Sequence, residues 1–312
     1  MNADPQFAPK AGQPLLLRDD LALVLAPNPS PMTYLGTNSY VLGRDRLVVI
    51  DPGPADPAHL AALLRVIAGR PVDYILVTHS HVDHSALAPA LAAQTGAPVC
   101  AFGDSTSGRS AVMAALVADG LTGGGEGIDH AFQPDLILHD GADLQGDWGQ
   151  ITAVHTPGHI GNHLCFAWED AVFCGDHVMG WASSLVSPPD GDLTDFMVSC
   201  HRLTGLPASV FYAGHGAPIT DPKARVRWLI DHRKGREAQI ISALARNPAT
   251  PQQLTHEIYG PLAPSLILAA KRNVLAHLVD LTQRGVVAAH PAPGDGAIFA
   301  LTTADDPAAA RN

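Results

Sequence analysis

The sequence predicts an α/β layered fold followed by a smaller, mostly helical module. Up to about residue 222, short apolar runs alternate with apolar stripes at helical spacing, which is the pattern of strands and helices packed in layers. From about residue 223, three helical patterns are followed by two short apolar runs, the element order of a winged helix. We therefore divide the chain into a main domain over residues 1–222, a winged-helix-like domain over 223–302 and a tail over 303–312.

Length and composition indicate a folded protein of two unequal parts. A chain of 312 residues exceeds what one core usually serves, and 46% hydrophobic with 16% charged residues is typical of a packed protein. The net charge of −11 argues against general affinity for nucleic acid or anionic membranes. No apolar run has transmembrane length and no signal pattern opens the chain, so we expect no membrane partner and a cytoplasmic location. The four cysteines form no C-x-x-C pair and are expected to be buried free thiols.

The elements of the main domain follow from apolar patterning. Residues 1–14 are expected to be a loose arm. Asp56 is placed to cap a helix with Pro57 at its first position. The glycine run at 123–125 is most simply a flexible loop. Strands are expected at residues 21–25, 38–42, 47–50, 74–77, 99–102, 151–154, 164–168, 171–174 and 209–212, and helices from 57 and at 86–93, 110–118 and 193–203.

The C-terminal module reads as three helices and a hairpin. A long helix rich in Lys and Arg runs from about residue 222 to 246. Thr250 and Gln253 form a capping-box pattern with Pro251 at the first turn of the next helix. A third helix is expected over 267–284, followed by a hairpin made of residues 286–289 and 297–301.

The strongest chemical signal is a cluster of His79, His81, Asp83 and His84 directly after a short apolar run. Imidazole and carboxylate are the ligands that zinc and similar divalent ions prefer. In an extended segment, His79, His81 and Asp83 share one side, and His84 breaks the alternation and can face a second ion. Such a cluster at the end of a strand predicts a metal site at a sheet edge.

Three further segments follow short apolar runs and contain Gly beside a candidate ligand. They hold His159, Asp176 and His215. Ligands at successive strand-to-loop junctions can converge at one end of a sheet, and Gly lets the backbone turn tightly beside an ion. The adjacent His155, His163 and His177 are expected to have structural or supporting roles, with substrate contact as the alternative.

The ordered motifs resemble those of a known family. His79-x-His81-x-Asp83-His84, Thr156-Pro157-Gly158-His159, Gly175-Asp176 and Gly214-His215-Gly216 look like the metal motifs of the metallo-β-lactamase-fold hydrolases. Ser187-Pro188-Pro189-x-Gly191-Asp192 and the three-helix C-terminal region are similar to one branch, the β-lactamase-like protein 2 group, which is related to glyoxalase II. The resemblance implies a metallo-β-lactamase αββα sandwich followed by a winged-helix domain.

The resemblance also implies a site of two ions. His79, His81 and His159 would bind one ion, Asp83, His84 and His215 the other, and Asp176 would bridge them. Each ion would keep an open position for water, as a catalytic site requires. Asp83 would also hold the attacking water, and Asp51 and His163 would support the ligands from behind. Zinc is the expected metal, and Mn and Fe accept the same donors.

Departures from the family pattern narrow the expected reaction. A zinc β-lactamase would be expected to lack the bridging carboxylate and to use Cys in its second site, whereas Asp83, His84 and Asp176 stand here. This argues against β-lactam hydrolysis. The glyoxalase II group shares the ligands, but its C-terminal helices differ from this tail.

Three functions are compatible with these residues. The first is hydrolysis of a small or carrier-bound ester or thioester by a metal-bridging hydroxide that attacks the acyl carbon. The second is an endoribonuclease acting on single-stranded RNA, as the resemblance implies for some members. Residues 223–290 carry ten Lys and Arg against four Asp and Glu, which either form a solvated helix face or track phosphates. The third is a DNA-binding regulator, which an intact ligand set argues against. We expect the acyl hydrolase.

Overall fold

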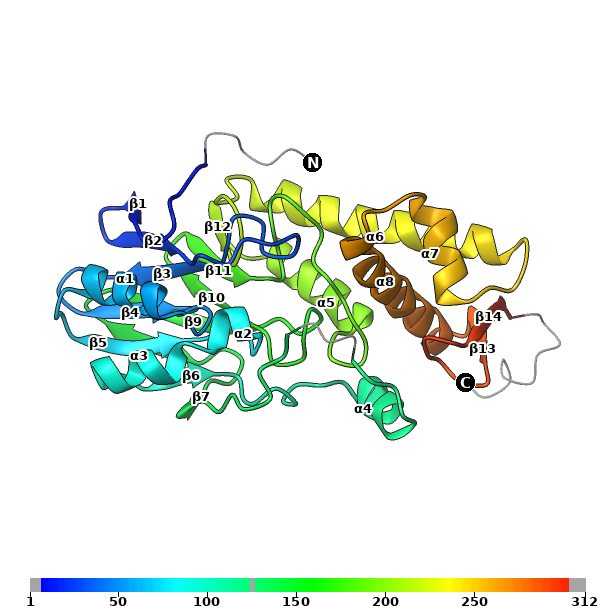
Figure 1. Cartoon of the computed structure of the whole chain (residues 1–312), viewed down its shortest axis with the longest axis horizontal. Coiled ribbons are helices and arrows are strands. Elements are labelled where there is room, and N and C mark those ends of the chain that lie inside the picture. The colour runs from blue at the N-terminus through cyan, green and yellow to red at the C-terminus, as the bar shows by residue number, and fades with distance from the viewer. Residues whose placement is uncertain (1–6, 124–126, 303–312) are drawn as a thin grey trace.

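The computed structural model describes residues 7–123 and 127–302 and has two stacked sheets with a helical module at one end (Figure 1). Part of the expected N-terminal arm, most of the glycine run and the tail from 303 lie outside these residues. One sheet has seven strands in sequence order: β1 (Pro14–Arg18), β2 (Leu21–Leu25), β3 (Asn38–Leu42), β4 (Leu47–Ile50), β5 (Val72–Leu76), β6 (Val99–Ala101) and β7 (Leu136–Ile137). The other has the order β12 (Val210–Ala213), β11 (Ala171–Gly175), β10 (Leu164–Trp168), β9 (Gly149–His155) and β8 (Asp143–Gly146).

The main core lies between the two sheets. Leu21, Leu23 and Leu25 of β2 point into it, where they share one cluster with Phe166 of β10. The intervening Val24 belongs instead to the cluster on the opposite face of the first sheet, as the two-residue period of a strand requires. Both faces of this sheet are therefore buried.

Helices cover the two outer faces. α1 (Pro57–Ile67) and α3 (Ala88–Thr95) pack on the first sheet, while α5 (Leu193–Thr204) and the start of α6 (Pro222–Leu244) pack on the second. Asp56 caps α1 by accepting from the backbone N–H of His59, as expected. Two further helices, α2 (Val82–Ser85) and α4 (Ala111–Ala118), lie in connections. The layers are thus α/β/β/α, which confirms the predicted sandwich.

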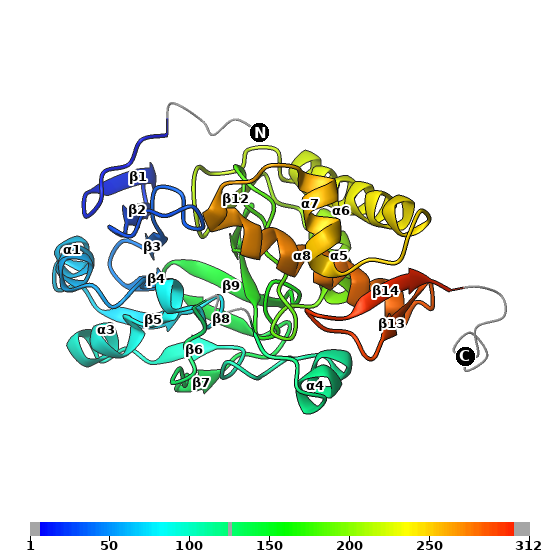
Figure 2. The ribbon, with the colours of Figure 1, turned by 45° about the vertical axis from the view of Figure 1, so that its right-hand side comes forward.

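The C-terminal module consists of α6, α7 (Pro251–Tyr259), α8 (Pro264–Gln283) and the hairpin of β13 (Val287–His290) and β14 (Ile298–Leu301). The predicted capping box at Thr250 and Gln253 is present. α6 contributes to two cores, because Leu229 packs with the second sheet while Ile240 packs with α8. The expected domain boundary at residues 222–223 therefore coincides with the start of α6, a helix that packs in the cores of both the main domain and the C-terminal module. Figure 2 shows α7 and α8 beside α5 and α6.

Most of the expected elements are confirmed, and the missed ones are the edge strands β1, β7 and β8 and the short helix α2, which holds Asp83 and His84 in place of the extended segment considered from sequence. β1 and β7 expose much of their side-chain surface, so they lack the alternating apolar signal of a half-buried strand. The prediction of a loose arm up to residue 14 is wrong at its end, because Gly12 donates its backbone N–H to Leu25 and β1 pairs with β2. All four cysteines are free and buried, as predicted.

Within residues 7–123 and 127–302, no helix taken singly is both long and apolar enough to cross a membrane. Helices α7 and α8, bent by 116° at their junction, meet those requirements only as a pair.

Candidate metal centre

All seven predicted ligands come together at one end of the two sheets, five of them on loops and two, Asp83 and His84, in the short helix α2. They follow β5 (His79, His81, Asp83 and His84), β9 (His159), β11 (Asp176) and β12 (His215). An isolated bridge between Thr37 and His215 and a hydrogen bond from Asn38 Nδ2 to the Ala213 carbonyl join the two sheets beside them. Residues far apart in the chain therefore share one site because the sheets end at the same edge.

Asp51 organises the loop that carries the first four ligands. Its carboxylate accepts the Thr78 backbone N–H at 2.7 Å and the Thr78 hydroxyl at 2.8 Å, and it lies 2.9 Å from Nδ1 of His84. On the far side of the loop, Nδ2 of Asn162 donates to the Ser80 hydroxyl at 2.9 Å. The loop is held from both sides, which fixes its side chains before any ion binds.

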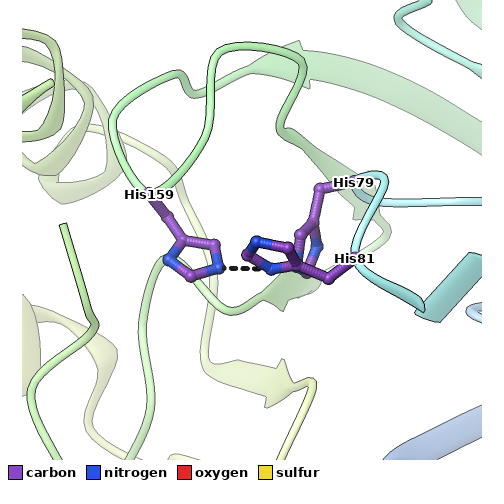
Figure 3. Close-up of side chains that lie close together, drawn as sticks. All are labelled: His79, His81 and His159. Atoms are coloured by element: carbon purple, nitrogen blue, oxygen red, sulfur yellow. Dashed lines mark hydrogen bonds between the residues drawn. The ribbon is translucent and has the colours of Figure 1, made fainter. Parts of the chain in front are cut away.

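The first group of ligands is formed by His79, His81 and His159 (Figure 3). Nδ1 of His81 lies 2.9 Å from Nε2 of His79 and 3.0 Å from Nε2 of His159. His81 follows β5 of the seven-stranded sheet, His159 follows β9 of the five-stranded sheet, and the two side chains point toward one another. Three ring nitrogens therefore meet at one place.

The hydrogen bonds made by Nδ1 of His159 and of His79 determine which tautomer each ring has and therefore what its Nε2 presents to the other ligands. Nδ1 of His159 donates to the Leu185 carbonyl at 2.7 Å. Nδ1 of His79 lies 2.9 Å from the Thr78 hydroxyl, which itself donates to Asp51, so the imidazole is the donor. In neutral rings with these tautomers, Nε2 of His79 and of His159 each carry a lone pair toward His81.

These three imidazoles are held in the neutral form. Burial and then the neighbouring His159 lower the pKa of His81 to about 3. Burial is also the main reason why the pKa of His79 lies well below, and that of His159 below, the ordinary value. Nδ1 of His81 can donate at most one proton, but it faces the lone pairs of two nitrogens, Nε2 of His79 and Nε2 of His159. A bound cation would satisfy these lone pairs better than hydrogen bonds among the three rings can.

The second group combines Asp83, His84 and His215, and Asp176 lies beside it. Oδ2 of Asp83 is 3.4 Å from Nε2 of His84 and 3.3 Å from Nε2 of His215. Asp176 reaches both groups, since its oxygens lie 3.3 Å from Nε2 of His215, 3.5 Å from Nε2 of His84 and 3.9 Å from Nε2 of His159. Its position between the groups matches a bridging carboxylate.

The electrostatics of the second group are opposite to those of the first. Burial alone would lower the pKa of His215, but Asp176 and Asp83 raise it to about 10. Asp83, Asp176 and Asp51 likewise overcome burial and raise the pKa of His84 well above its ordinary value. Burial would raise the pKa of Asp83 and Asp176, yet the facing imidazoles hold both well below the usual range. In this half of the site, ionised carboxylates therefore face imidazoles that bind a proton readily, and the carboxylates attract positive charge.

Two observations test whether the residues fit metal ions. Nε2 of His84 and Oδ1 of Asp176 are buried and form no hydrogen bond with the described residues, although they face each other at 3.5 Å. The donor atoms within each group lie within 4.8 Å of one another. Imidazoles and carboxylates of this kind suit divalent cations, and seven donors exceed the four of one tetrahedral ion. The cluster is therefore able to hold divalent metal ions.

The cluster forms the floor of a pocket of about 570 Å³. His81, Asp83, His159, Asp176 and His215 line the floor. The walls come from three places: residues 31–33, residues 179–185 and the start of α8. Among the described residues, no Lys or Arg lines the pocket. The pocket is of ordinary size for a small-molecule site, and its charges are confined to the metal cluster.

The wall segment 179–187 is held by the C-terminal module. Arg225 on α6 donates to the carbonyls of Met179 and Ala182. Arg233 on α6 donates to the Ser184 carbonyl and, at 2.8 Å, to Oδ1 of Asn273 on α8. The same Oδ1 accepts the Val186 backbone N–H at 3.1 Å. We call Arg225, Arg233 and Asn273 the polar clamp.

The polar clamp corrects one expectation about the basic helix. The phosphate-tracking alternative places Arg225 and Arg233 among exposed charges, together with Lys223, Arg227, Lys234 and Arg236. Arg225 and Arg233 are instead 9% and 2% exposed and donate to loop carbonyls. The spacing of these arginines in the sequence does not show which face of the long helix α6 is buried. For that reason, the buried Arg225 and Arg233 could not be told apart from exposed basic residues.

The remaining histidines near the motifs do not line the pocket. His163 lies behind His79, with ring centroids 5.2 Å apart, and its Nδ1 is 2.9 Å from the Thr156 hydroxyl. His155 stacks on Phe102, and His177 stacks on Phe196. Their roles in the fold are therefore packing and support.

Sequence reasoning missed several groups that position the ligands. The buried Thr37 hydroxyl donates to Oδ2 of Asp83 at 3.0 Å, and the Gly36 carbonyl lies 3.1 Å from Nδ1 of His215. The Leu185 carbonyl fixes His159. Backbone carbonyls carry no sequence signal. Only the position of Thr37, next to the expected strand from Asn38, could have indicated its role.

Comparisons with known proteins agree with this geometry. Residues 32–215 match the metallo-β-lactamase superfamily. The chain belongs to that superfamily. Residues 250–295 match the β-lactamase-associated winged helix domain, which confirms the predicted C-terminal module.

Named proteins with similar sequences align with most of the chain. Lactamase-like protein aptB of Emericella nidulans is 31% identical over 234 residues, spanning 73% of this chain and 67% of that protein. A β-lactamase-like protein 2 homolog of Caenorhabditis elegans is 29% identical over 278 residues and covers 87% of both chains, which confirms the predicted branch. An atrochrysone carboxyl ACP thioesterase of Passalora fulva is 30% identical over 259 residues, covering 76% of this chain and 67% of that protein. Another fungal relative, lactamase-like protein adaB of Aspergillus niger, is matched over only 64% of its length.

Solved structures share the whole two-part fold. The metallo-β-lactamase family protein TTHA1429 of Thermus thermophilus is 26% identical, with a TM-score of 0.73 over 92% of this chain and 100% of that one. A β-lactamase domain protein of Burkholderia ambifaria has a TM-score of 0.77 at 21% identity over 96% of each chain, which shows the same fold.

Proposed function

We propose that this protein is a hydrolase of esters or thioesters that works with two divalent metal ions. The observation that carries the proposal is the ligand cluster at the floor of a pocket whose walls bear no basic side chain among the described residues. His79, His81 and His159 would hold one ion, Asp83, His84 and His215 the other, and Asp176 would contact both. Zn²⁺ is the expected metal, with Mn²⁺ or Fe²⁺ accepted by the same donors.

The reaction adds water to an acyl carbon and breaks its bond to sulfur or oxygen, which leaves a carboxylic acid and a thiol or alcohol. When bound, the two ions would lower the pKa of water and place positive charge beside the developing oxyanion.

The protein's own residues supply the geometry. Asp83 lines the pocket, and its carboxylate, which accepts a hydrogen bond from the Thr37 hydroxyl, would orient the attacking water. Asp51 and the Leu185 carbonyl keep His84 and His159 aimed at the floor.

The choice of an acyl substrate rests on charge. A polyanion would meet a chain of net charge −11 and a pocket wall without Lys or Arg among the described residues. Two of the basic residues that could have tracked phosphates belong to the polar clamp. A carrier-bound acyl substrate agrees with the thioesterase relative, whose name states an ACP-linked substrate. Cleavage of single-stranded RNA is the alternative outcome of the test.

The test compares substrates on protein loaded separately with Zn²⁺, Mn²⁺ and Fe²⁺. Acyl thioesters of N-acetylcysteamine, a p-nitrophenyl ester and a single-stranded RNA are offered to the parent and to Asp83→Ala. We expect thioester or ester hydrolysis that Asp83→Ala loses. Cleavage of RNA alone, lost in the same variant, would replace the acyl proposal with the endoribonuclease. No hydrolysis of any substrate with any of the metals would overturn both.

A further inference from the structure

The mouth of the pocket exposes apolar side chains from two distant parts of the chain. Met32, before β3, is 44% exposed, and Leu266 and Leu268, at the start of α8, are 37% and 48% exposed. All three line the pocket above the metal cluster. Single exposed apolar residues are ordinary, but a group of them around a concave site indicates a surface that a ligand covers.

The inner walls of the pocket are also largely apolar. Met179, Trp181 and Leu185 line it from the loop that the polar clamp holds. Trp181 is fixed by stacking on Tyr34, with ring centroids 5.1 Å apart. The apolar surface thus runs from the mouth down to Leu185, whose carbonyl holds His159. A group bound along it would have its reacting end at the metal cluster.

The side-chain amide of Asn273 in the wall is already engaged by the protein, whereas Nε1 of Trp181 has no hydrogen-bond partner among the described residues. Asn273 lines the pocket, but its Oδ1 accepts from Val186 and Arg233, and its Nδ2 donates to the Ala269 carbonyl at 3.1 Å. A sugar or a peptide would need such groups to be available as partners. An apolar ligand needs none.

We infer that this wall binds the acyl group of the substrate and that the enzyme selects a long or bulky apolar acyl chain, with Leu266 and Leu268 as specificity-determining residues. This inference rests on the proposed ester or thioester hydrolase. It assigns substrate selection to the C-terminal module, because α8 supplies these two side chains while the main domain supplies the ligands.

The inference has a quantitative consequence. Burying one methylene group contributes about 0.8 kcal/mol, so each methylene that enters the pocket should raise kcat/KM about fourfold. The rise should stop when the acyl chain fills the pocket of about 570 Å³. A short acetyl group would leave the wall uncovered and react slowly.

The experiment measures kcat/KM for acetyl, butyryl, hexanoyl, octanoyl and decanoyl thioesters of N-acetylcysteamine. It uses the parent, Leu268→Asp and Leu268→Ser. Ile298→Asp is the matched control, because Ile298 is 50% exposed in the same C-terminal module and does not line the pocket. We expect a steep rise with length in the parent and in the control, and a curve flattened at least tenfold at decanoyl in both Leu268 variants.

A binding measurement separates this inference from the proposed function. The decanoyl amide of cysteamine, which resists hydrolysis, is titrated by calorimetry into the metal-free parent, Leu268→Asp and Ile298→Asp. Binding that only Leu268→Asp weakens supports the acyl wall even if no thioester is turned over. Equal kcat/KM for all chain lengths, or equal amide binding by all three proteins, would overturn the inference while leaving the hydrolase proposal standing.

Discussion

Nδ1 of His159 lies 2.7 Å from the carbonyl oxygen of Leu185. Leu185 belongs to the segment that the polar clamp of α6 and α8 fixes in place. The orientation of a candidate metal ligand in the main domain is therefore tied to the C-terminal module through one backbone carbonyl. Support of this kind typically changes metal affinity or activity by about 10–100-fold.

Asn273→Leu should loosen this connection. The substitution removes the acceptor of the Val186 N–H and of Arg233 while roughly keeping the side-chain volume. We expect kcat/KM for a thioester to fall about 10–100-fold and the free energy of unfolding to fall by about 1–3 kcal/mol, measured by kinetics and urea unfolding. Asn273→Asp keeps the acceptor and should stay near the parent. Full activity of Asn273→Leu would show that the polar clamp is not needed to position His159 for hydrolysis.

The two sets of arginines on α6 should behave differently. Replacing Arg225 and Arg233 with Met leaves three loop carbonyls without their donors, and we expect kcat/KM to fall at least about tenfold. Replacing the exposed Arg227 and Lys234 with Ala should leave thioester hydrolysis within about twofold. Slow hydrolysis in the exposed pair, or normal hydrolysis in the buried pair, would contradict this assignment.

Asp83→Ala should abolish hydrolysis without unfolding the protein. Asp83 touches both imidazoles of the second group and lines the pocket. We expect the rate to drop by more than about 100-fold and the metal content to fall by one ion per chain, with an unchanged circular dichroism spectrum. Asp19→Ala, at a side chain that is 92% exposed, is the control and should match the parent. An active, folded Asp83→Ala enzyme would exclude Asp83 from catalysis.

The buried His59 should make folding sensitive to acid. Burial, opposed by Asp56, lowers the pKa of His59 from 6.5 to about 4. Between these values the unfolded chain binds a proton that the folded chain does not, so the stability from neutral His59 is present above about pH 6.5 and is lost as the pH falls toward 4. Over this pH range, the contribution of His59 to the free energy of unfolding falls by about 3 kcal/mol.

The measurement compares urea unfolding of the parent and His59→Gln at pH 4.5 and pH 7, since the difference between the two proteins cancels the titration of all other groups. We expect the parent to lose more stability on acidification than His59→Gln. Parallel curves for the two proteins would show that His59 does not titrate in this window.

The fold and the clustering of the seven candidate ligands could be predicted from sequence because their signals are local. His79 to His84 lie within six residues after an apolar run, and the strands from Leu21 and Asn38 are fully buried on both faces. The supporting groups could not be predicted, since the Leu185 and Gly36 carbonyls act through the backbone. The burial of Arg225 and Arg233 could not be read either, because it depends on how α6 packs against a loop far away in the sequence.

The central claim is that two metal ions at this cluster drive acyl hydrolysis, and a metal titration tests it most directly. Protein stripped with a chelator is titrated with Zn²⁺ while hydrolysis of the decanoyl thioester is followed and bound metal is counted by elemental analysis. The account predicts no hydrolysis without metal and a rate that reaches its plateau at two bound ions per chain. A plateau at one ion per chain, or hydrolysis that is independent of metal, would contradict it.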